Sequence, residues 1–355
     1  MARKRLTVAV VGATGAVGTE MLRVLKDRKF PIAGLRLLAS ERSAGKKIAF
    51  NGSSVRVEKL ENKSFNGVDV ALFSAGAGRS LEFAPEAVKR GAIVVDNSSA
   101  FRMDPHVPLV VPEVNPDALR GHRGIIANPN CSTIVMLVAL KPLHDAATIR
   151  HITVATYQSV SGAGARAMYQ LVSETRDALR GLKVLDRGPK ADAPIDVRVK
   201  AGSARTLPQQ IAFNLIPQVD VFLDNGYTKE EMKLVNETRK ILGVPDMPVS
   251  ATCVRVPVFM SHSEAIWIQT ERWLSPAEAY ELLRKAPGVT VVDGRKGKPY
   301  PMPIDSAGQD NVHVGRIRVD DSVENGLTLW ACGDNLRKGA ATNAVQIAEL
   351  LFSGK

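Results

Sequence analysis

Cys131 is the residue of this chain best placed for covalent chemistry, because of the residues on either side of it. Asn130 belongs to the residue types that cap helix N-termini, and the apolar run at residues 134–140 predicts a helix buried on all sides. Cys131 then lies in the first helical turn, where unpaired N–H groups and the helix dipole favour an anion. Such a position lowers the pKa of a thiol and populates the thiolate, which attacks a carbonyl carbon. Cysteine is also a common small core residue, so both interpretations stay open at this point.

A thiol that forms and breaks an acyl bond needs a group that moves a proton, and His262 is the best placed of the six histidines. It follows a strand-like run and has serines on both sides, so that a loop there could present it to a cleft. A structural histidine is the alternative. Arg255 lies within a run of valines, which predicts a strand. An arginine in such a strand faces either solvent or a site that needs a bidentate carboxylate partner.

Further charged residues and glycines could bind an anionic substrate. Glu230 and Lys233 are three residues apart in a predicted helix at 229–242, where they could hold the two ends of a zwitterionic or phosphorylated molecule. They could equally form an ordinary i,i+3 surface pair. Arg102 follows the end of a predicted strand and could contact phosphate, and Gly162 allows a ligand to approach the backbone or simply makes a turn.

A glycine-rich turn supplies a candidate site for a hydride carrier. The sequence GATGAVG at residues 12–18 follows a β-branched run at 6–11 and precedes apolar residues at helical spacing. Strand, glycine turn and helix are the context of a dinucleotide fingerprint, in which the pyrophosphate lies on the helix N-terminus. The spacing is GxxGxxG, a variant of the usual GxGxxG, and a glycine turn without a ligand is the alternative.

The end of the next predicted strand, at residues 34–39, indicates which dinucleotide binds. Ser40, Arg42 and Ser43 can hydrogen-bond to a 2′-phosphate and neutralise it, which predicts NADP. Glu41 could instead bind a ribose, which keeps NAD as the alternative.

The order of elements predicts two kinds of sheet. Short strands at residues 68–74, 92–96, 109–111 and 124–127 alternate with helices such as 85–90, which predicts a Rossmann-type, doubly wound parallel α/β sheet. Residues 74–76 and 97–99 then fall at the carboxyl ends of strands, where such sheets bind ligands. After residue 151 the strands at 152–160, 252–259, 264–270, 312–319 and 326–331 follow one another with few helices, which predicts a mostly antiparallel α+β domain. We expect helices at 165–179 and 335–352, and a loop or interface arm at about 181–208.

The composition limits the partners and the compartment. The net charge of +11 comes from scattered basic residues, which favours anionic small ligands over nucleic acid. No apolar stretch is long enough to span a bilayer, so no membrane partner is expected. The three cysteines lie far apart without a CxxC pair, so neither a disulfide framework nor a metal site is indicated, and a cytoplasmic location is expected.

Taken together, these motifs resemble the aspartate-semialdehyde dehydrogenase family along nearly the whole chain. The matching segments are GATGAVG at 12–18, SERSAGK at 40–46, SAG at 74–76, NSSAFRM at 97–103, NPNCSTI at 128–134, YQSVSGAG at 157–164, EEMKLVNETRKI at 230–241, RVPV at 255–258, His262 and GDNLRKGAA at 333–341. The combination of NPNCSTI with QSVSGAG is the most specific part, whereas the glycine turn alone is weak.

The resemblance implies a role for each matching residue. Cys131 would be the nucleophile, His262 the acid/base, and Gln158 would orient the substrate or the attacking group. The implied substrate contacts are Arg102, Asn130, Ser161, Gly162, Glu230, Lys233 and Arg255, with Arg255 on the α-carboxylate, Glu230 on the amino group, and Arg102 and Lys233 on the phosphate. The implied NADP contacts are Gly12, Thr14, Gly15, Ala16, Val17, Ser40, Arg42, Ser43, Ser74, Ala75, Gly76 and Asn335.

The implied reaction is NADPH-dependent reductive dephosphorylation of L-aspartyl 4-phosphate to L-aspartate 4-semialdehyde through a thioester on Cys131. It serves the biosynthesis of lysine through diaminopimelate, of methionine and of threonine. The implied architecture is an NADP-binding domain at residues 1–130, completed by a C-terminal helix at 335–355, and a catalytic and dimerisation domain at 131–334 that forms a homodimer. The alternatives are another acyl-phosphate reductase of the N-acetyl-glutamyl-phosphate type, against which Glu230 argues, or a catalytically silent NADP-binding regulator.

Overall fold

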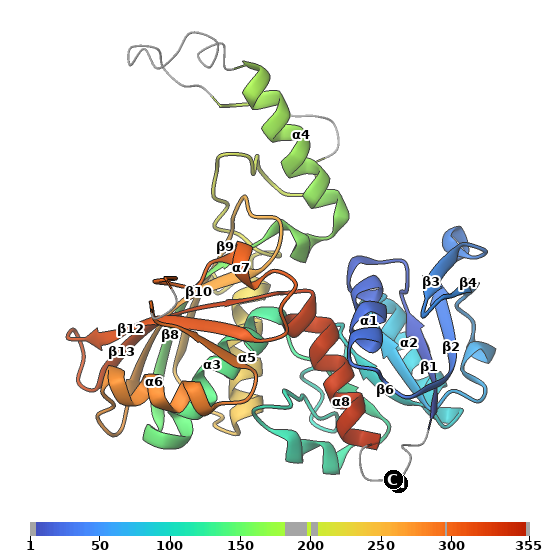
Figure 1. Cartoon of the computed structure of the whole chain (residues 1–355), viewed down its shortest axis with the longest axis horizontal. Coiled ribbons are helices and arrows are strands. Elements are labelled where there is room, and N and C mark those ends of the chain that lie inside the picture. The colour runs from blue at the N-terminus through green and yellow to red at the C-terminus, as the bar shows by residue number, and fades with distance from the viewer. Residues whose placement is uncertain (1–4, 182–196, 200–204, 295–296, 353–355) are drawn as a thin grey trace.

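The computed structural model describes residues 5–181, 197–199, 205–294 and 297–352, and its strands form two sheets that lie side by side (Figure 1). The first sheet has the strand order β3-β4-β2-β1-β5-β6-β7, and the second has the order β11-β12-β13-β10-β8-β9. None of the described helices combines the length and the apolar character needed to cross a membrane.

The first sheet confirms the predicted doubly wound parallel architecture. Its neighbouring strands are parallel from β4 to β7, and the order runs outward from β1 in both directions. In such a sheet, ligands bind where the order reverses, between β1 and β5. Its strands are β1 (Leu6–Val11), β2 (Ile32–Ala39), β3 (Lys47–Phe50), β4 (Ser53–Lys59), β5 (Val70–Phe73), β6 (Ile93–Asp96) and β7 (Ile125–Ala127).

Three details of this sheet differ from the sequence prediction. β3 and β4 form an unpredicted antiparallel hairpin at the edge, whose turn holds Asn51 and Gly52 at positive φ. Asn-Gly is the preferred pair for such a turn, so the signal was present in the sequence. The strand expected at 109–111 is only an isolated bridge from Leu109 to Ala127. The helix expected at 85–90 is longer, α2 (Ala77–Lys89), and contains Pro85 in its interior.

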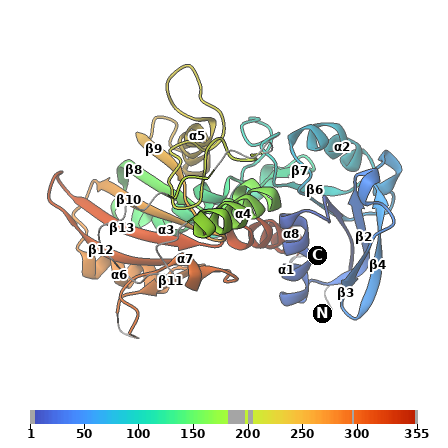
Figure 2. The ribbon, with the colours of Figure 1, turned by 90° about the horizontal axis from the view of Figure 1, so that it is seen from above.

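Helices cover both faces of the first sheet because the side chains of its central strands are buried on both sides. One face packs against α1 (Ala16–Asp27) and α8 (Asn343–Phe352), and the other packs against α2. α8 lies beside α1 in both views, so the end of the chain returns to the first sheet as expected (Figure 1; Figure 2). The predicted single helix at 335–352 is wrong in its first part, where Arg337–Thr342 forms a π-helical turn.

The second sheet is mixed, and three of its five strand pairings are antiparallel. The antiparallel strands β12, β13, β10 and β8 form its centre, while β9 and the unpredicted β11 pair in parallel at the two edges. Its strands are β8 (Ile149–Gln158), β9 (Val249–Arg255), β10 (His262–Thr270), β11 (Val289–Val292), β12 (Val312–Asp320) and β13 (Gly326–Gly333). The accompanying helices are α3 (Cys131–Ala147), α4 (Ala165–Gly181), α5 (Lys229–Leu242), α6 (Pro276–Lys285) and α7 (Pro303–Ser306).

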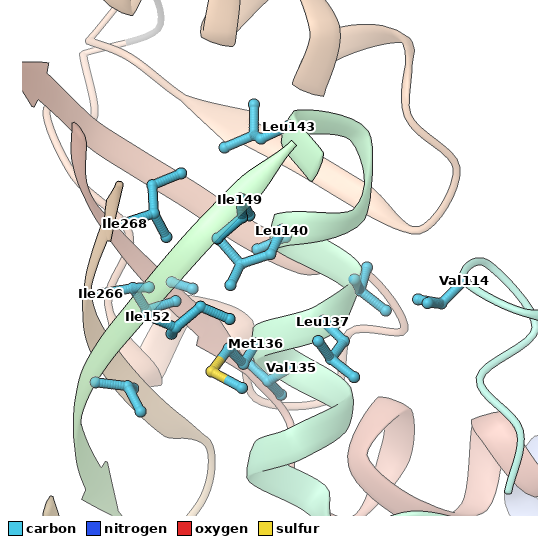
Figure 3. Packing of buried hydrophobic residues seen from close by; sticks show 14 of the residues in the cluster. Val114, Val135, Met136, Leu137, Leu140, Leu143, Ile149, Ile152, Ile266 and Ile268 are labelled. Carbon is cyan, nitrogen blue, oxygen red and sulfur yellow. The ribbon is translucent and has the colours of Figure 1, made fainter. Parts of the chain in front are cut away.

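α3 is the centre of the second core, as its apolar sequence predicts. Every residue from 132 to 140 is buried. Figure 3 shows Leu140 beside Ile149 and Met136 beside Ile152, both of β8, and Ile266 of β10 belongs to the same buried cluster. Because the apolar side chains of this helix pack against the second sheet, the helix holds its first residue, Cys131, in place.

α4 stands away from the two sheets (Figure 1). Its buried Glu174 accepts hydrogen bonds from the backbone of Ile211 and Ala212, which attaches the following segment to the helix. Most of the loop or arm expected at about 181–208 lies outside the described residues. The described parts, 197–199 and 205–208, contain neither helix nor strand.

Candidate active site

A cleft of about 550 Å³ lies where the glycine turn after β1 faces the start of α3 and the ends of β8, β9 and β10. All ten predicted catalytic and substrate-binding residues line it: Arg102, Asn130, Cys131, Gln158, Ser161, Gly162, Glu230, Lys233, Arg255 and His262. Of the predicted cofactor contacts, Gly15, Ala16, Val17, Ser74, Gly76 and Asn335 line the cleft, whereas Gly12, Thr14, Ser40, Arg42, Ser43 and Ala75 are not part of its lining.

Cys131 occupies the first position of α3, and the predicted cap by Asn130 is confirmed. The Asn130 side chain accepts hydrogen bonds from the backbone N–H groups of Ser132 (3.0 Å) and Thr133 (3.4 Å). The π-helical turn also approaches Cys131 closely. A Cβ added to Gly339 would lie 2.8 Å from the Cβ of Cys131, closer than real Cβ atoms come. Sequence reasoning missed Gly339, since nothing local marks it as a neighbour of Cys131.

The predicted lowering of the Cys131 pKa is wrong for the free protein. Burial raises the pKa of this thiol to about 12, and the nearby Glu230 carboxylate adds to the rise. The Arg102 and Arg255 guanidinium groups and the Ser132 N–H lower it, but by less. Desolvation therefore outweighs the helix terminus, because a thiolate enclosed by the walls of the cleft loses hydration whichever dipole it faces.

His262 is buried and is held as a neutral ring. Burial, with Arg255 as the second cause, lowers the pKa of His262 to about 3. Its Nδ1 accepts a hydrogen bond from the backbone N–H of Ser159 (3.1 Å), so in the neutral ring the proton is on Nε2. A Cβ added to Gly162 would come 3.3 Å from that Nε2, which places the N–H beside the cleft lining. In this geometry the imidazole is a proton donor at Nε2.

Gln158 and Arg255 end two neighbouring strands and are paired in their register. Gln158 donates from Nε2 to Ser132 Oγ (2.7 Å) and to Glu230 Oε1 (3.2 Å). Arg255 donates from Nη1 to the carbonyl oxygen of Ser159 (2.8 Å), and its Nε has no partner among the described residues. Because the Arg255 side chain is buried and lines the cleft, the solvent-facing alternative is wrong.

Glu230 and Lys233 do pair, but inside the cleft and not on an open surface. Lys233 Nζ donates to Glu230 Oε2 (2.9 Å) and to Asp220 Oδ2 (2.8 Å). Burial alone would raise the pKa of Glu230, but Lys233, Asn130 and Gln158 together bring it below its usual value. Burial likewise opposes the charge of Lys233, and the two carboxylates raise its pKa in spite of this. Both groups are therefore charged at neutral pH.

Arg102 is buried and held by three bonds. Its Nε donates to Asn128 O (3.0 Å), Nη1 to Glu237 Oε1 (3.0 Å) and Nη2 to Asn97 O (2.7 Å). A guanidinium has five N–H donors, so two have no partner among the described residues and can serve a ligand in the cleft that Arg102 lines. Sequence reasoning missed Glu237, although its position seven residues after Glu230 places it on the same face of α5.

The cofactor side of the cleft is made of backbone that packs closely. Gly12 has φ +88°, and a Cβ there would lie 2.4 Å from the carbonyl oxygen of Ser74. A Cβ on Gly18 would lie 2.2 Å from the carbonyl oxygen of Gly12. Glycine is therefore required at both positions. The start of α1 lines the cleft, which gives the helix N-terminus that a pyrophosphate needs.

The segment after β2 forms a 3₁₀ turn, Glu41–Ser43, next to this glycine turn. Thr14 Oγ1 donates to Ser43 Oγ (3.3 Å), which connects the two segments. Glu41 forms an ion pair with Lys59 (3.3 Å).

The Asn335 side chain connects the loop that contains Ser159 and Ser161 with the loop that contains Ser261. Its Oδ1 accepts from Ser159 Oγ (3.1 Å), Ser161 Oγ (3.1 Å) and the backbone N–H of Ser261 (3.0 Å). Its side chain is thus engaged with the protein, although the residue lines the cleft. Ser159, which also bonds to His262 and Arg255, is a second organising residue that the sequence did not reveal.

Comparison with known proteins agrees with this arrangement. Residues 7–122 match the family model "Semialdehyde dehydrogenase, NAD binding domain", and residues 140–338 match "Semialdehyde dehydrogenase, dimerisation domain". The chain is 54% identical to the aspartate-semialdehyde dehydrogenase of Aquifex aeolicus over 97% of both chains, and 52% identical to that of Bacillus subtilis over 98% of this chain and 97% of the relative.

The chain belongs to the aspartate-semialdehyde dehydrogenase family. It is an oxidoreductase of aspartate-derived amino-acid biosynthesis, with a nicotinamide-binding Rossmann domain. It also superposes on a crystal structure of aspartate semialdehyde dehydrogenase II from Vibrio cholerae, described as complexed with ASA. That likeness has a TM-score of 0.90 and 49% identity, and it covers 99% of both chains. The resemblance stated from the motifs is thereby confirmed.

Proposed function

We propose that this member of the family uses Cys131 to reduce L-aspartyl 4-phosphate to L-aspartate 4-semialdehyde with NADPH, releasing phosphate. The observation that supports this most is the set of groups in one cleft. Cys131 shares it with one buried carboxylate, Glu230, and two buried guanidinium groups, those of Arg102 and Arg255. An aspartyl phosphate carries one ammonium, one carboxylate and one phosphate, which is the complementary set of charges.

Each charge of this substrate has a proposed partner. Arg255 binds the α-carboxylate, since its Nε has no partner among the described residues and can form a two-pronged contact together with the neighbouring Nη2. Glu230 binds the ammonium, because it is held as a carboxylate by its neighbours. Arg102 binds the phosphate with its two remaining N–H groups, and Lys233 adds a positive charge nearby. Asn130, Ser161 and Gly162 complete the lining.

Cys131 then carries out the acyl transfer. The Cys131 thiolate attacks the acyl carbon, the carbon–oxygen bond to phosphate breaks, and a thioester on Cys131 remains. NADPH, when bound, supplies the hydride that reduces this thioester, and the resulting thiohemiacetal on Cys131 collapses to the semialdehyde. His262 holds the Nε2 proton beside the cleft, where this N–H donates a hydrogen bond that stabilises first the oxyanion and then the departing Cys131 thiolate. Gln158 keeps Ser132 and Glu230 in position.

Cys131 loses its proton when the substrate is bound, because desolvation keeps the thiol protonated in the free protein. Glu230 is the second cause of the raised pKa, and pairing with a substrate ammonium would offset its negative charge. Arg102 and Arg255 already act in the opposite direction. Binding of the correct amino acid therefore favours the thiolate.

We propose NADP and not NAD as the cofactor. Gly12, Gly15, Ala16 and Val17 would accept the pyrophosphate against the start of α1, with Ser74, Ala75, Gly76 and Asn335 beside it. Ser40, Arg42 and Ser43 would bind the 2′-phosphate, and Thr14 connects Ser43 to the glycine turn. Glu41 is paired with Lys59, which favours NADP, since a ribose-binding acid would have to leave that ion pair.

The second sheet supports a homodimer. Its match is to a dimerisation domain, and Tyr157, Trp267 and Trp330 are among the residues that line a hollow of about 500 Å³ on the strands. We divide the chain at residues 130 and 131, with 335–355 assigned to the first domain. A cytoplasmic location is in keeping with three free cysteines.

The test is phosphate-dependent reduction of NADP by aspartate semialdehyde, run in reverse with NAD in a parallel reaction. NADP reduction that requires phosphate supports the acyl-phosphate chemistry and the substrate together. No reduction, with the aldehyde shown to be intact, would contradict the proposal. N-acetyl-glutamate semialdehyde serves as the control substrate, because its acylated nitrogen cannot form an ion pair with Glu230.

A further inference from the structure

Glu237 is a buried carboxylate for which the reaction above provides no task. Its residue is 1% exposed, and its two oxygens accept from two different segments. Oε1 accepts from Arg102 Nη1 (3.0 Å), and Oε2 accepts from the backbone N–H of Asn130 (2.6 Å). One carboxylate thus joins the guanidinium assigned to the phosphate with the residue that precedes the nucleophile.

The same helix also holds the loop that carries Arg102. Lys240, three residues after Glu237 on α5, donates from Nζ to the carbonyl oxygens of Arg102 (2.8 Å), Asp104 (2.7 Å) and Val107 (2.8 Å). Lys240 therefore fixes the backbone of the loop, and Glu237 fixes the end of the Arg102 side chain. Glu230, seven residues earlier, reaches the same cleft and accepts from the Asn130 side chain (2.9 Å).

We propose that Glu237 is a positioning residue that sets the Arg102 guanidinium relative to the Asn130–Cys131 backbone. The phosphate and the attacking sulfur must meet at one acyl carbon, so an error in either position slows the transfer. Glu237 acts through Arg102 and Asn130 and does not touch the substrate. This role rests on the proposed function, because it presumes that Arg102 binds phosphate.

The charge of Glu237 and its geometry have opposite effects on phosphate binding, which makes the proposal testable. Removing a negative charge beside Arg102 would by itself strengthen the binding of an anion. Glutamine has one acceptor and one donor group, whereas both partners of Glu237 are donors. In Glu237→Gln, one of the two partners must therefore lose its bond. Weaker phosphate binding in this variant then shows that Arg102 has lost its orientation, since the loss of the Glu237 charge alone would strengthen binding.

The experiment compares Glu237→Gln with Glu231→Gln in the full-length enzyme. Glu231 is a matched control, since it is a buried carboxylate on the same helix and accepts from the backbone N–H groups of Thr228 (2.6 Å) and Cys253 (2.9 Å). In the reverse reaction, KM is measured separately for phosphate, aspartate semialdehyde and NADP, together with kcat. Thermal unfolding is recorded for both variants.

For Glu237→Gln we expect the KM for phosphate to rise about tenfold or more and kcat to fall, with the KM for NADP within about twofold of wild type. Glu231→Gln is expected to lose stability without changing the KM for phosphate. An unchanged or lower KM for phosphate in Glu237→Gln, or an equal rise in Glu231→Gln, would overturn the proposal.

Glu237→Asp decides the question if Glu237→Gln does not fold. It keeps the charge but shortens the side chain by one methylene, so the same rise in the KM for phosphate is expected. If neither Glu237 variant folds while Glu231→Gln does, Glu237 serves stability alone and the proposal is wrong. A wild-type enzyme that reduces NADP without needing phosphate would contradict the proposed function instead.

Discussion

The two sides of the cleft are built in different ways. The cofactor side comes mainly from one short segment, in which Gly12 and Gly18 allow backbone to pack against backbone. The catalytic side is made of buried charged side chains from distant segments. Arg102 bonds to Glu237, 135 residues away, and Asn130 bonds to Glu230, 100 residues away.

This difference predicts which kind of substitution impairs each side of the cleft. A site made of local backbone depends on the absence of side chains, so an added atom damages it. A site made of buried, mutually bonded charges depends on each partner, since removing one leaves another uncompensated in a low-dielectric environment. Substitutions on the catalytic side should therefore impair turnover, and substitutions on the cofactor side should impair only NADP binding.

The largest effect is expected from Cys131→Ala. Without the thiol no thioester forms, so turnover should be abolished, while NADP binding measured by fluorescence titration or calorimetry should be retained. Turnover close to that of wild type would contradict the assignment of the nucleophile. Loss of NADP binding as well would show that the two sides are not separable.

Gly339→Ala tests the tight contact between the π-helical turn and the nucleophile. The new Cβ would lie 2.8 Å from the Cβ of Cys131, so the thiol must move, and kcat should fall by about a hundredfold. Gly78→Ala is the matched control, because its Cβ would meet no atom within 4 Å. Equal kcat values for the two variants would show that the π-helical turn shifts to accommodate the new Cβ without displacing Cys131.

Arg255→Lys should raise the KM for aspartate semialdehyde by about tenfold, because an ammonium cannot reproduce the two-pronged contact of a guanidinium. Steady-state kinetics at saturating NADP and phosphate measure the effect. An unchanged KM and rate would remove Arg255 from carboxylate binding.

Arg42→Ala tests the cofactor side. Loss of its positive charge should raise the KM for NADP by about tenfold, with little change for NAD and for the aldehyde. The ratio of kcat/KM for the two cofactors is the measurement. If this ratio does not change, the turn at Glu41–Ser43 does not bind the 2′-phosphate.

The last prediction concerns the pH dependence of folding stability and not turnover. The pKa of His262 is lowered to about 3 in the folded protein and lies near 6.5 in an unfolded chain. The unfolded state therefore takes up a proton first as the pH falls below 6.5, and the folded state loses stability progressively from there down to about pH 3. Between pH 7 and pH 5 this amounts to roughly 2 kcal/mol.

His262→Gln should remove that share of the acid sensitivity. Urea unfolding at pH 7 and pH 5 measures it as the difference between the two free energies of unfolding. If wild type and His262→Gln lose the same free energy over this interval, His262 does not carry a depressed pKa.

The sequence by itself determined the elements whose causes are local. The glycine turn, the Asn130 cap and the apolar run of α3 each follow from neighbouring residues, and the structure reproduces all three. The Asn51-Gly52 hairpin was also encoded locally, although it was not predicted. Family motifs named ten residues as catalytic or substrate-binding, and the structure places all ten in the lining of one cleft.

Tertiary structure alone decided the electrostatics of that cleft. The helix terminus favours a thiolate at Cys131, but desolvation and the nearby Glu230 carboxylate raise its pKa instead. Likewise, the side of the strand that Arg255 occupies, and the partners of Arg102, depend on segments far away in the chain. Desolvation and long-range bonds are properties of the packed molecule, whereas capping and turn formation are properties of a few consecutive residues.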